Sequence, residues 1–277
     1  YFLAMLDAAY PYPIPAPSAT GTDGIVAFLH KAGKPITTSV ETLRQRKNIR
    51  AFADALREHG GGLAAVHNLL GDRNDHLLFA EGDPRGTNLV KRIFEEIYLG
   101  EELFRAEYSE PPLIHRGDGL IRRERLIPNL QSLIALSRRV ALGIATGRPR
   151  HQATYALEAA GIAKYFRALV THEDVVDAEQ KLFQASGQRI TLSKPHPFTL
   201  LEAVTHITRE RVRAAYIGDT LDDVRAANAA KAEMDFVSIG CLAPWEDKPA
   251  MRREFERIGA DVIVEQPDEL VEWIEKT

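Results

Sequence analysis

Three carboxylates follow an apolar run near residue 218. In "AAYIGDTLDDVRAAN", Asp219, Asp222 and Asp223 come within five positions, directly after Gly218. Like charges at this spacing repel one another and raise each other's pKa unless a cation lies between them. Acidic residues also suit the first turn of a helix, which accounts for one or two of the three. The cluster at a strand tip therefore predicts magnesium, which takes one or two carboxylates together with waters and phosphate oxygens.

Two other segments place polar groups directly after or before regular structure. The apolar run "VALGIA" is followed by Thr146, Gly147 and Arg148. A hydroxyl, a glycine amide and the start of a helix meet there, which suits a phosphate. A simple helix cap explains Thr146 equally well. Arg148 either reaches a substrate or only lies at the helix start.

Lys194 lies in "LSKPHPF", where prolines hold the chain extended before a helix and would fix an ammonium group. The alternative is an ordinary surface lysine, because most lysines in proteins are exposed. Lys181 is the alternative lysine, in the polar "DAEQKLFQASGQ".

The elements that position these residues alternate along the second part of the chain. Apolar runs predict strands at 140–146, 166–172, 214–219, 235–240 and 261–266. Amphipathic patterns predict helices at 128–139, 150–161, 197–207, 221–230 and 267–277. This alternation predicts an α/β fold, a parallel sheet with helices on both faces. Such sheets bind ligands beyond the carboxyl ends of their strands, so the polar segments are expected to meet there.

The first part of the chain carries helical patterns and almost no strand patterns. Leu89, Ile93, Ile97 and Leu99 recur near helical spacing. The segment "SEPPLIHRGDG" has two prolines and two glycines and is interpreted as a linker. We therefore predict a helical domain over 1–115 and a sheet domain over 116–277, with the helical domain moving as a body.

Composition narrows the classes of function. The 35 basic and 39 acidic residues give a formal net charge of −4, so nucleic acid is not an expected partner. Cys241 is the single cysteine, which excludes an intrachain disulfide and favours a cytoplasmic location. No apolar run approaches the roughly 18 residues of a membrane span, so no membrane partner is expected. The histidines show no zinc-ligand spacing, and Trp245 and Trp273 are interpreted as packing residues.

Taken together and in this order, "GIATGRP", "SKPHP" and "YIGDTLDD" resemble the second, third and fourth motifs of the haloacid dehalogenase-like (HAD) hydrolase superfamily. The resemblance is close from about residue 116 onward, and the helical first part resembles the α-helical cap of the phosphoglycolate-phosphatase-like branch. It implies a Rossmann-like core, a helical cap and a magnesium-dependent phosphatase, monomeric or homodimeric, that acts on a small phosphorylated metabolite through an aspartyl-phosphate. Alternatives are a phosphomutase of the same fold and a non-catalytic binding protein.

The resemblance also assigns roles to residues around the phosphate. Thr146 and the Gly147 amide would hold the transferring phosphoryl oxygens, and Arg148 would contact the substrate. Lys194 would neutralise charge on the nucleophile and the phosphoryl group, which suits its compact ammonium.

The remaining implied roles concern the metal. Asp219 would bind magnesium directly. Asp223 would act in catalysis, either by orienting Lys194 or at the metal, with Asp222 as a substitute.

The family's first motif, a strand ending in Asp-x-Asp that supplies the nucleophile, is not found in the sequence. Asp7 has no partner two residues on, and "GTDGIV" has Gly21 in the nucleophile's position after a proline-rich stretch that cannot be a central strand. We expect this strand to be encoded before Tyr1. Without it, the strands ending at Thr146 and Asp219 would expose unpaired edges. A degenerate homologue without turnover is the alternative.

Overall fold

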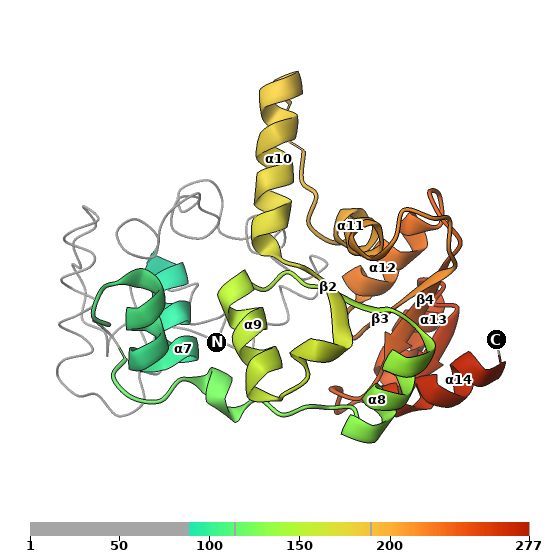
Figure 1. Ribbon diagram of the computed structural model, residues 1–277, viewed down its shortest axis with the longest axis horizontal. Helices are drawn as coiled ribbons and strands as arrows, with labels where there is room; N and C mark the ends of the chain where they lie inside the picture. Colours follow the sequence, from blue (N-terminus) through green and yellow to red (C-terminus); the bar gives the residue numbers. More distant parts are fainter. Residues whose placement is uncertain (1–88, 114, 189, 277) are drawn as a thin grey trace. The chain divides into compact units, whose positions relative to one another are not determined.

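The computed structural model describes residues 89–113, 115–188 and 190–276, without the side chains of 89, 90 and 93. The chain divides into two units, Tyr1–Glu124 and Arg125–Thr277 (Figure 1). The described elements are α7 (Leu89–Tyr108), η2 (Leu120–Arg123), α8 (Leu130–Arg139), β1 (Leu142–Ala145), α9 (Arg150–Ala159), η3 (Ala163–Tyr165), β2 (Phe166–Val170), α10 (His172–Ser186), α11 (Phe198–Ile207), β3 (Ala214–Gly218), α12 (Leu221–Ala230), β4 (Phe236–Cys241), α13 (Lys248–Arg257), β5 (Val262–Val264), η4 (Pro267–Glu269) and α14 (Leu270–Lys276).

Helix α7 of the first unit is broken at Gly100, where the backbone is left-handed with φ at 75°. A second piece of backbone crosses the break, and Glu101 N–H donates to Gly117 O over 2.9 Å. A Cβ on Gly100 would lie 2.2 Å from Gly119 N, so the two chains can approach only because glycine has no side chain. The helical spacing of the sequence did not predict this break.

The segment 109–119, predicted as a linker, is fastened to α7. The fully buried Glu96 carboxylate accepts the Leu113 N–H at 2.9 Å and pairs with the Arg92 guanidinium at 2.7 Å. The first unit extends to Glu124 and so includes this segment, and the predicted domains over 1–115 and 116–277 stay a prediction. Residues 1–88 lie outside the described part of the chain, so the helical cap stays a prediction.

Five parallel strands form the core of the second unit. β1 pairs with β2, and β3, β4 and β5 form a second sheet in that order. On one face of the second sheet, Phe255 of α13 lies against Gly240. On the other face, Trp273 of α14 packs against a cluster that contains Val237 and Ile239. The predicted parallel sheet with helices on both faces is confirmed.

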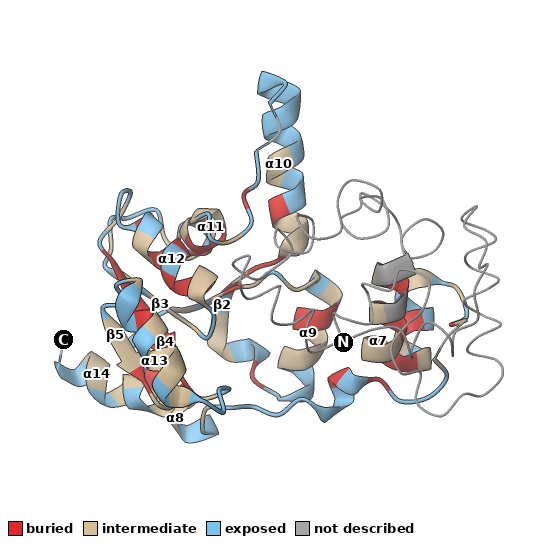
Figure 2. Cartoon of the chain, turned by 180° about the vertical axis from the view of Figure 1, so that it is seen from behind, coloured by how far each residue is buried: buried red, intermediate tan, exposed pale blue. Residues whose placement is uncertain are grey.

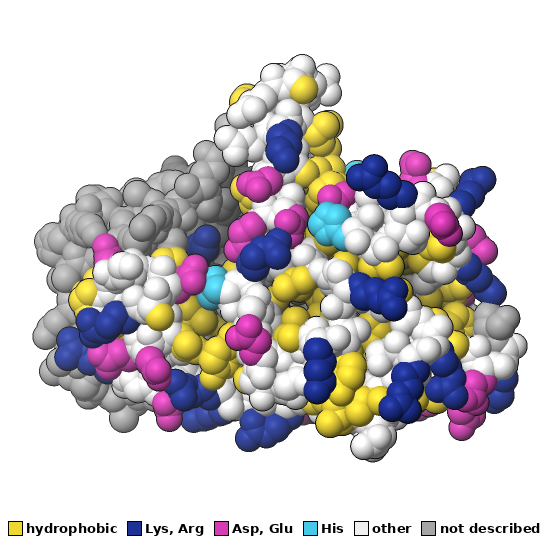
Figure 3. Space-filling model, viewed as in Figure 1, with side chains coloured by type: hydrophobic (Ala, Val, Ile, Leu, Met, Phe, Trp, Pro, Cys, Tyr) yellow, Lys and Arg dark blue, Asp and Glu magenta, His cyan; other side chains and the backbone are white. Residues whose placement is uncertain are grey.

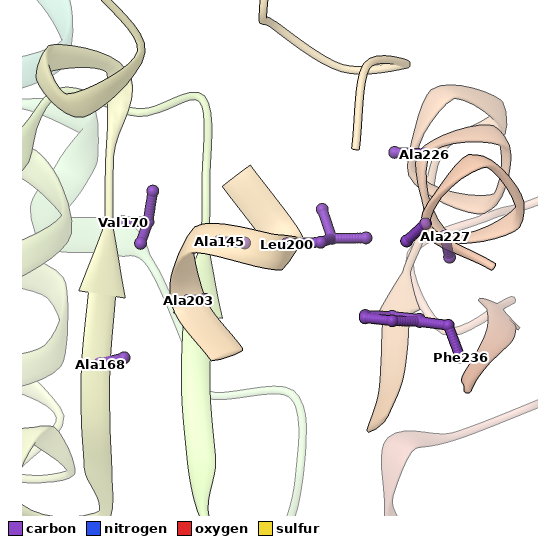
Figure 4. Packing of buried hydrophobic residues seen from close by; sticks show 9 residues of the cluster. Ala145, Ala168, Val170, Leu200, Ala203, Ala226, Ala227 and Phe236 are labelled. Carbon is purple, nitrogen blue, oxygen red and sulfur yellow. The ribbon is translucent and has the colours of Figure 1, made fainter. Parts of the chain in front are cut away.

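The two sheets leave a gap between β1 and β3, bridged by α11. Figure 4 shows Leu200 of α11 between Ala145 on one side and Phe236 on the other. β4 has strands on both sides and all its residues are buried, whereas Gly143 in β1 and Ala215 in β3 are exposed. Within the described ranges, β1 and β3 thus each keep one edge without a strand partner, as the sequence predicted for these two strands.

Helix α10 extends away from the sheets (Figure 1) and is mostly exposed (Figure 2). It begins with a capping box between Thr171 and Asp174 and ends at Gly187, whose φ is 70°. Hydrophobic side chains line one side of it in Figure 3, and Leu182 and Phe183 are exposed. None of the helices in the described ranges has the length and apolar character that crossing a bilayer requires.

Candidate active site

The Lys194 ammonium lies where the carboxyl ends of β1 and β3 face each other. Its Nζ donates to Asp223 Oδ1 at 2.6 Å, to Tyr216 Oη at 2.8 Å and to Ala145 O at 3.4 Å. The segment before α11 thus delivers the lysine to the edge where Thr146 follows Ala145. The structure therefore brings Lys194 and Asp223 together beside the gap, as the sequence predicted for the third and fourth segments.

Asp223 holds this lysine through a helix cap. Its second oxygen accepts Thr220 N–H at 3.0 Å and the Thr220 hydroxyl at 2.7 Å, which forms a capping box at the start of α12. A Cβ on Gly218 would lie 2.3 Å from Asp223 Cβ, so the glycine at the strand tip makes room for the carboxylate. Burial alone would raise the pKa of Asp223. The Lys194 charge and hydrogen bond, with those from Thr220, outweigh burial and lower that pKa.

Tyr216 completes the group and was not predicted from the sequence. Its hydroxyl donates to Ala145 O at 2.9 Å and lies 3.2 Å from Asp223 Oδ1. Burial, followed by the nearby Asp223 charge, raises the pKa of Tyr216 well above its usual value, so the phenol stays a donor. A tyrosine in an apolar run carries no sequence signal for such a contact, because strands bury aromatic residues routinely.

The three clustered carboxylates have separate surroundings. Asp222 lies on the exposed side of α12 and pairs with Arg225 at 2.9 Å. Asp219 is exposed at the tip of β3, and partial burial and the neighbouring Asp223 charge raise its pKa. Asp223 is engaged by Lys194 and Thr220, so its predicted role at a metal remains a prediction.

Asp219 is the carboxylate whose surroundings fit a cation. The described residues contain no group of three or more His, Cys, Asp or Glu side chains that could hold a metal ion. Magnesium needs fewer, because it keeps several waters and takes one or two protein carboxylates plus phosphate oxygens. One exposed, hard carboxylate at the strand tip, beside the buried carboxylate of Asp223, suits that requirement.

The loop after β1 presents Thr146, Gly147 and Arg148. The Thr146 hydroxyl accepts Arg148 N–H at 3.1 Å, and a Cβ on Gly147 would meet nothing within 4 Å. The first amide of α9, Arg150 N–H, donates to a Glu173 carboxylate at 2.8 Å. The protein's own carboxylate thus takes one amide of the predicted anion site, and the role of Thr146, Gly147 and Arg148 toward a phosphate stays a prediction.

The sequence matches the family model of haloacid dehalogenase-like hydrolase over residues 22–231. The chain belongs to this family. The predicted membership, made from the segments around Thr146, Lys194 and Asp219, is confirmed. The matched region starts one residue before Asp23, in a stretch outside the described residues.

Named relatives of this HAD-family chain include two phosphatases. It is 31% identical over 134 residues to N-acetylmuramic acid 6-phosphate phosphatase of Pseudomonas aeruginosa. The matched region covers 48% of this chain and 50% of that protein. It is 28% identical over 149 residues to phosphoglycolate phosphatase of Nitrosococcus oceani, covering 53% and 56%. The chain thus spans about half the length of these curated relatives. 

A solved structure supports the fold. The crystal structure of a Northeast Structural Genomics Consortium target superposes with a TM-score of 0.53 at 21% identity, covering 99% of this chain and 76% of that chain. At this level of identity the likeness shows the fold alone.

Proposed function

We propose that the protein is a magnesium-dependent phosphatase, a phosphoric monoester hydrolase acting on a small phosphorylated metabolite. The observation that carries the proposal is the Lys194 ammonium, fixed by Asp223 between β1 and β3, which in the described ranges each keep one edge without a strand partner. A fixed positive charge at the carboxyl edge of a parallel sheet is placed to meet a phosphoryl group. The names of the two curated relatives support the same class of reaction. The single buried cysteine, Cys241, accords with a reducing, cytoplasmic location.

The nucleophile is proposed to lie on a strand in the gap, outside the described residues. Its carboxylate oxygen would attack phosphorus, and the bond from phosphorus to the leaving oxygen would break as that oxygen takes a proton. Water would then attack phosphorus and release inorganic phosphate and the carboxylate. Lys194 would offset the negative charge gathered by the two reacting groups, while the Thr146 hydroxyl and Gly147 N–H orient phosphoryl oxygens.

The proposed metal ligand of the described chain is Asp219. Magnesium, when bound, neutralises phosphate charge and holds the group in line. Asp223 acts through Lys194, because both its oxygens are already bonded within the protein.

A matched pair of lysine substitutions tests the proposal. The protein would be assayed with magnesium on a panel of phosphate esters, beside Lys194→Met and Lys181→Met. We expect the first substitution to lower turnover about 100-fold or more on every ester, because it removes charge stabilisation of the transferring group. Lys181 is on the exposed α10, so its loss should leave turnover unchanged.

Two results would contradict the proposal: no ester hydrolysed by the parent protein, or equal turnover in both variants. Lys194→Met leaves Asp223 without its partner, so Lys194→Met with Asp223→Asn provides a second variant in which neither charge is stranded. Urea unfolding of each variant separates loss of chemistry from loss of folding.

A further inference from the structure

The loop that follows β4 contacts the strand tip that carries Asp219. The Trp245 indole N–H donates to the main-chain carbonyl of Asp219, with a distance of 2.7 Å between Nε1 and O. This carbonyl belongs to the turn between β3 and α12, one residue before the helix cap Thr220. The indole therefore links two loops at the carboxyl edge of the sheet, where the proposed chemistry takes place.

The loop that carries Trp245 is anchored on both sides. Leu242 is completely buried, and its N–H donates to Val264 O at 2.9 Å. Trp245 N–H closes a turn onto Leu242 O at 3.1 Å. Asp247 caps α13 by accepting Ala250 N–H at 2.9 Å. The backbone on both sides of Trp245 is thus anchored, so the indole reaches the Asp219 carbonyl from a loop that is held at both ends.

The sequence predicted a packing role for Trp245, which stays a prediction; the structure adds a specific contact of its indole N–H. Trp245 is 37% exposed, among the large apolar residues of the described chain that face solvent. Part of the residue therefore stays accessible, while its indole N–H is held by the Asp219 carbonyl. The use of the N–H points to a role for the bond.

We propose that Trp245 is a positioning residue for a divalent cation: it fixes the backbone of Asp219 so that the carboxylate is presented to magnesium. The inference rests on the proposed function, because it takes Asp219 as the metal ligand. A ligand whose backbone is already ordered loses less freedom on binding a cation, so binding is tighter. Groups that orient metal ligands contribute about 10- to 100-fold to metal affinity when they bond the ligand directly. Acting through the backbone, Trp245 should contribute toward the lower end, about 10-fold.

Magnesium binding, measured without substrate, tests the inference. Isothermal titration of the protein with magnesium chloride would compare the parent, Trp245→Phe and Trp273→Phe. Phenylalanine keeps an aromatic ring and removes only the N–H donor and part of the ring, so Trp245→Phe should weaken magnesium binding about 10-fold at an unchanged unfolding midpoint. Trp273 packs in α14 on the far face of the β3–β4–β5 sheet, and its replacement should leave magnesium affinity unchanged.

A second readout uses the fact that the chain has two tryptophans. In the Trp273→Phe protein, Trp245 is the remaining tryptophan, and magnesium should change its fluorescence because its partner is the metal ligand. Parental affinity in Trp245→Phe, or equal weakening in both tryptophan variants, overturns the inference. The Asp219→Asn variant separates the two proposals. If it binds magnesium as tightly as the parent, Asp219 is not the metal ligand. If it loses magnesium affinity while Trp245→Phe keeps the parental affinity, only the role of the indole is overturned.

Discussion

Replacing Asp223 by asparagine tests the physical account of the site most directly. The side chain keeps its shape, but the partner of the Lys194 ammonium loses its charge. The aspartate side chain is 7% exposed and the lysine side chain 18%, so the ammonium is left poorly solvated. Removing one member of a buried ion pair costs about 3–5 kcal/mol, and the partial exposure of Lys194 places this pair near 3 kcal/mol.

The asparagine also meets the wrong neighbours. One carboxylate oxygen now faces Lys194 and the other faces the two Thr220 donors. An amide has a single acceptor oxygen, so its NH₂ group must confront donors on one side. Weakening of the α12 cap adds about 1 kcal/mol. The free energy of unfolding at pH 7 should therefore fall by about 4 kcal/mol.

The dependence on pH supplies a second check. The folded-state pKa of Asp223 is lowered, because the Lys194 and Thr220 interactions outweigh burial. Its charge therefore stabilises the fold fully above the ordinary aspartate pKa of about 3.9, and this stabilisation is lost as the pH falls through the lower folded-state pKa. The deficit of the variant should be constant from about pH 7 to 5 and shrink below about pH 4.

Urea unfolding at several pH values measures the loss in the free energy of unfolding and its dependence on pH. The midpoints of parent and variant are compared where the denaturant slope m is the same for both. Asp222→Asn is the matched control, since that carboxylate is exposed and pairs with Arg225 on the helix surface. It should cost at most about 0.5 kcal/mol. A deficit below about 1 kcal/mol for Asp223→Asn, or one that stays constant down to pH 3, would refute the assignment of Asp223 as the charged anchor of Lys194.

Two further predictions concern the backbone. Gly100→Ala should lower the free energy of unfolding by about 3 kcal/mol, because its Cβ would overlap Gly119 N. The control is Gly187→Ala, at a similar φ but in open space, which should cost about 1 kcal/mol in thermal or urea unfolding. Similar losses in the two variants would show that the close crossing in α7 is not what requires glycine. Thr220→Ala should cost about 1 kcal/mol through the lost cap, against less than about 0.5 kcal/mol for the exposed mid-helix Thr205→Ala, and equal values would exclude a capping contribution.

The sheet and the placement of Lys194 could be predicted because both depend on local patterns. The apolar runs before Thr146 and Asp219 alternate with amphipathic helices, which favours parallel strands, and parallel strands bring their carboxyl ends to one edge. The prolines after Lys194 precede α11 as expected. Charge spacing alone could not assign the three aspartates, because their roles depend on which cation packs beside each one.

Other features were missed for identifiable reasons. α10 was interpreted as a polar segment because its exposed sides hide the helical period, although Thr171 and Asp174 have the spacing of a capping box. α13 was missed although Asp247 caps it, because strongly charged residues leave it only a thin apolar stripe. The contacts of Tyr216 and Trp245 join segments distant in the sequence, and no local pattern specifies such contacts.

The carbonyl of Ala145 accepts hydrogen bonds that a further strand beside β1 would compete for, and this competition would affect the charge that Lys194 offers to a substrate. Thr146 N–H points to β2, so the carbonyl in the same peptide plane points into the gap. It now takes bonds from Tyr216 and, at 3.4 Å, from Lys194. A strand seated in the gap would bring a third donor to an oxygen with two lone pairs, and the longest bond would be the first to yield. The ammonium N–H released in this way would become available to a phosphoryl oxygen, so pairing of a further strand with β1 would raise the positive charge open to the proposed substrate.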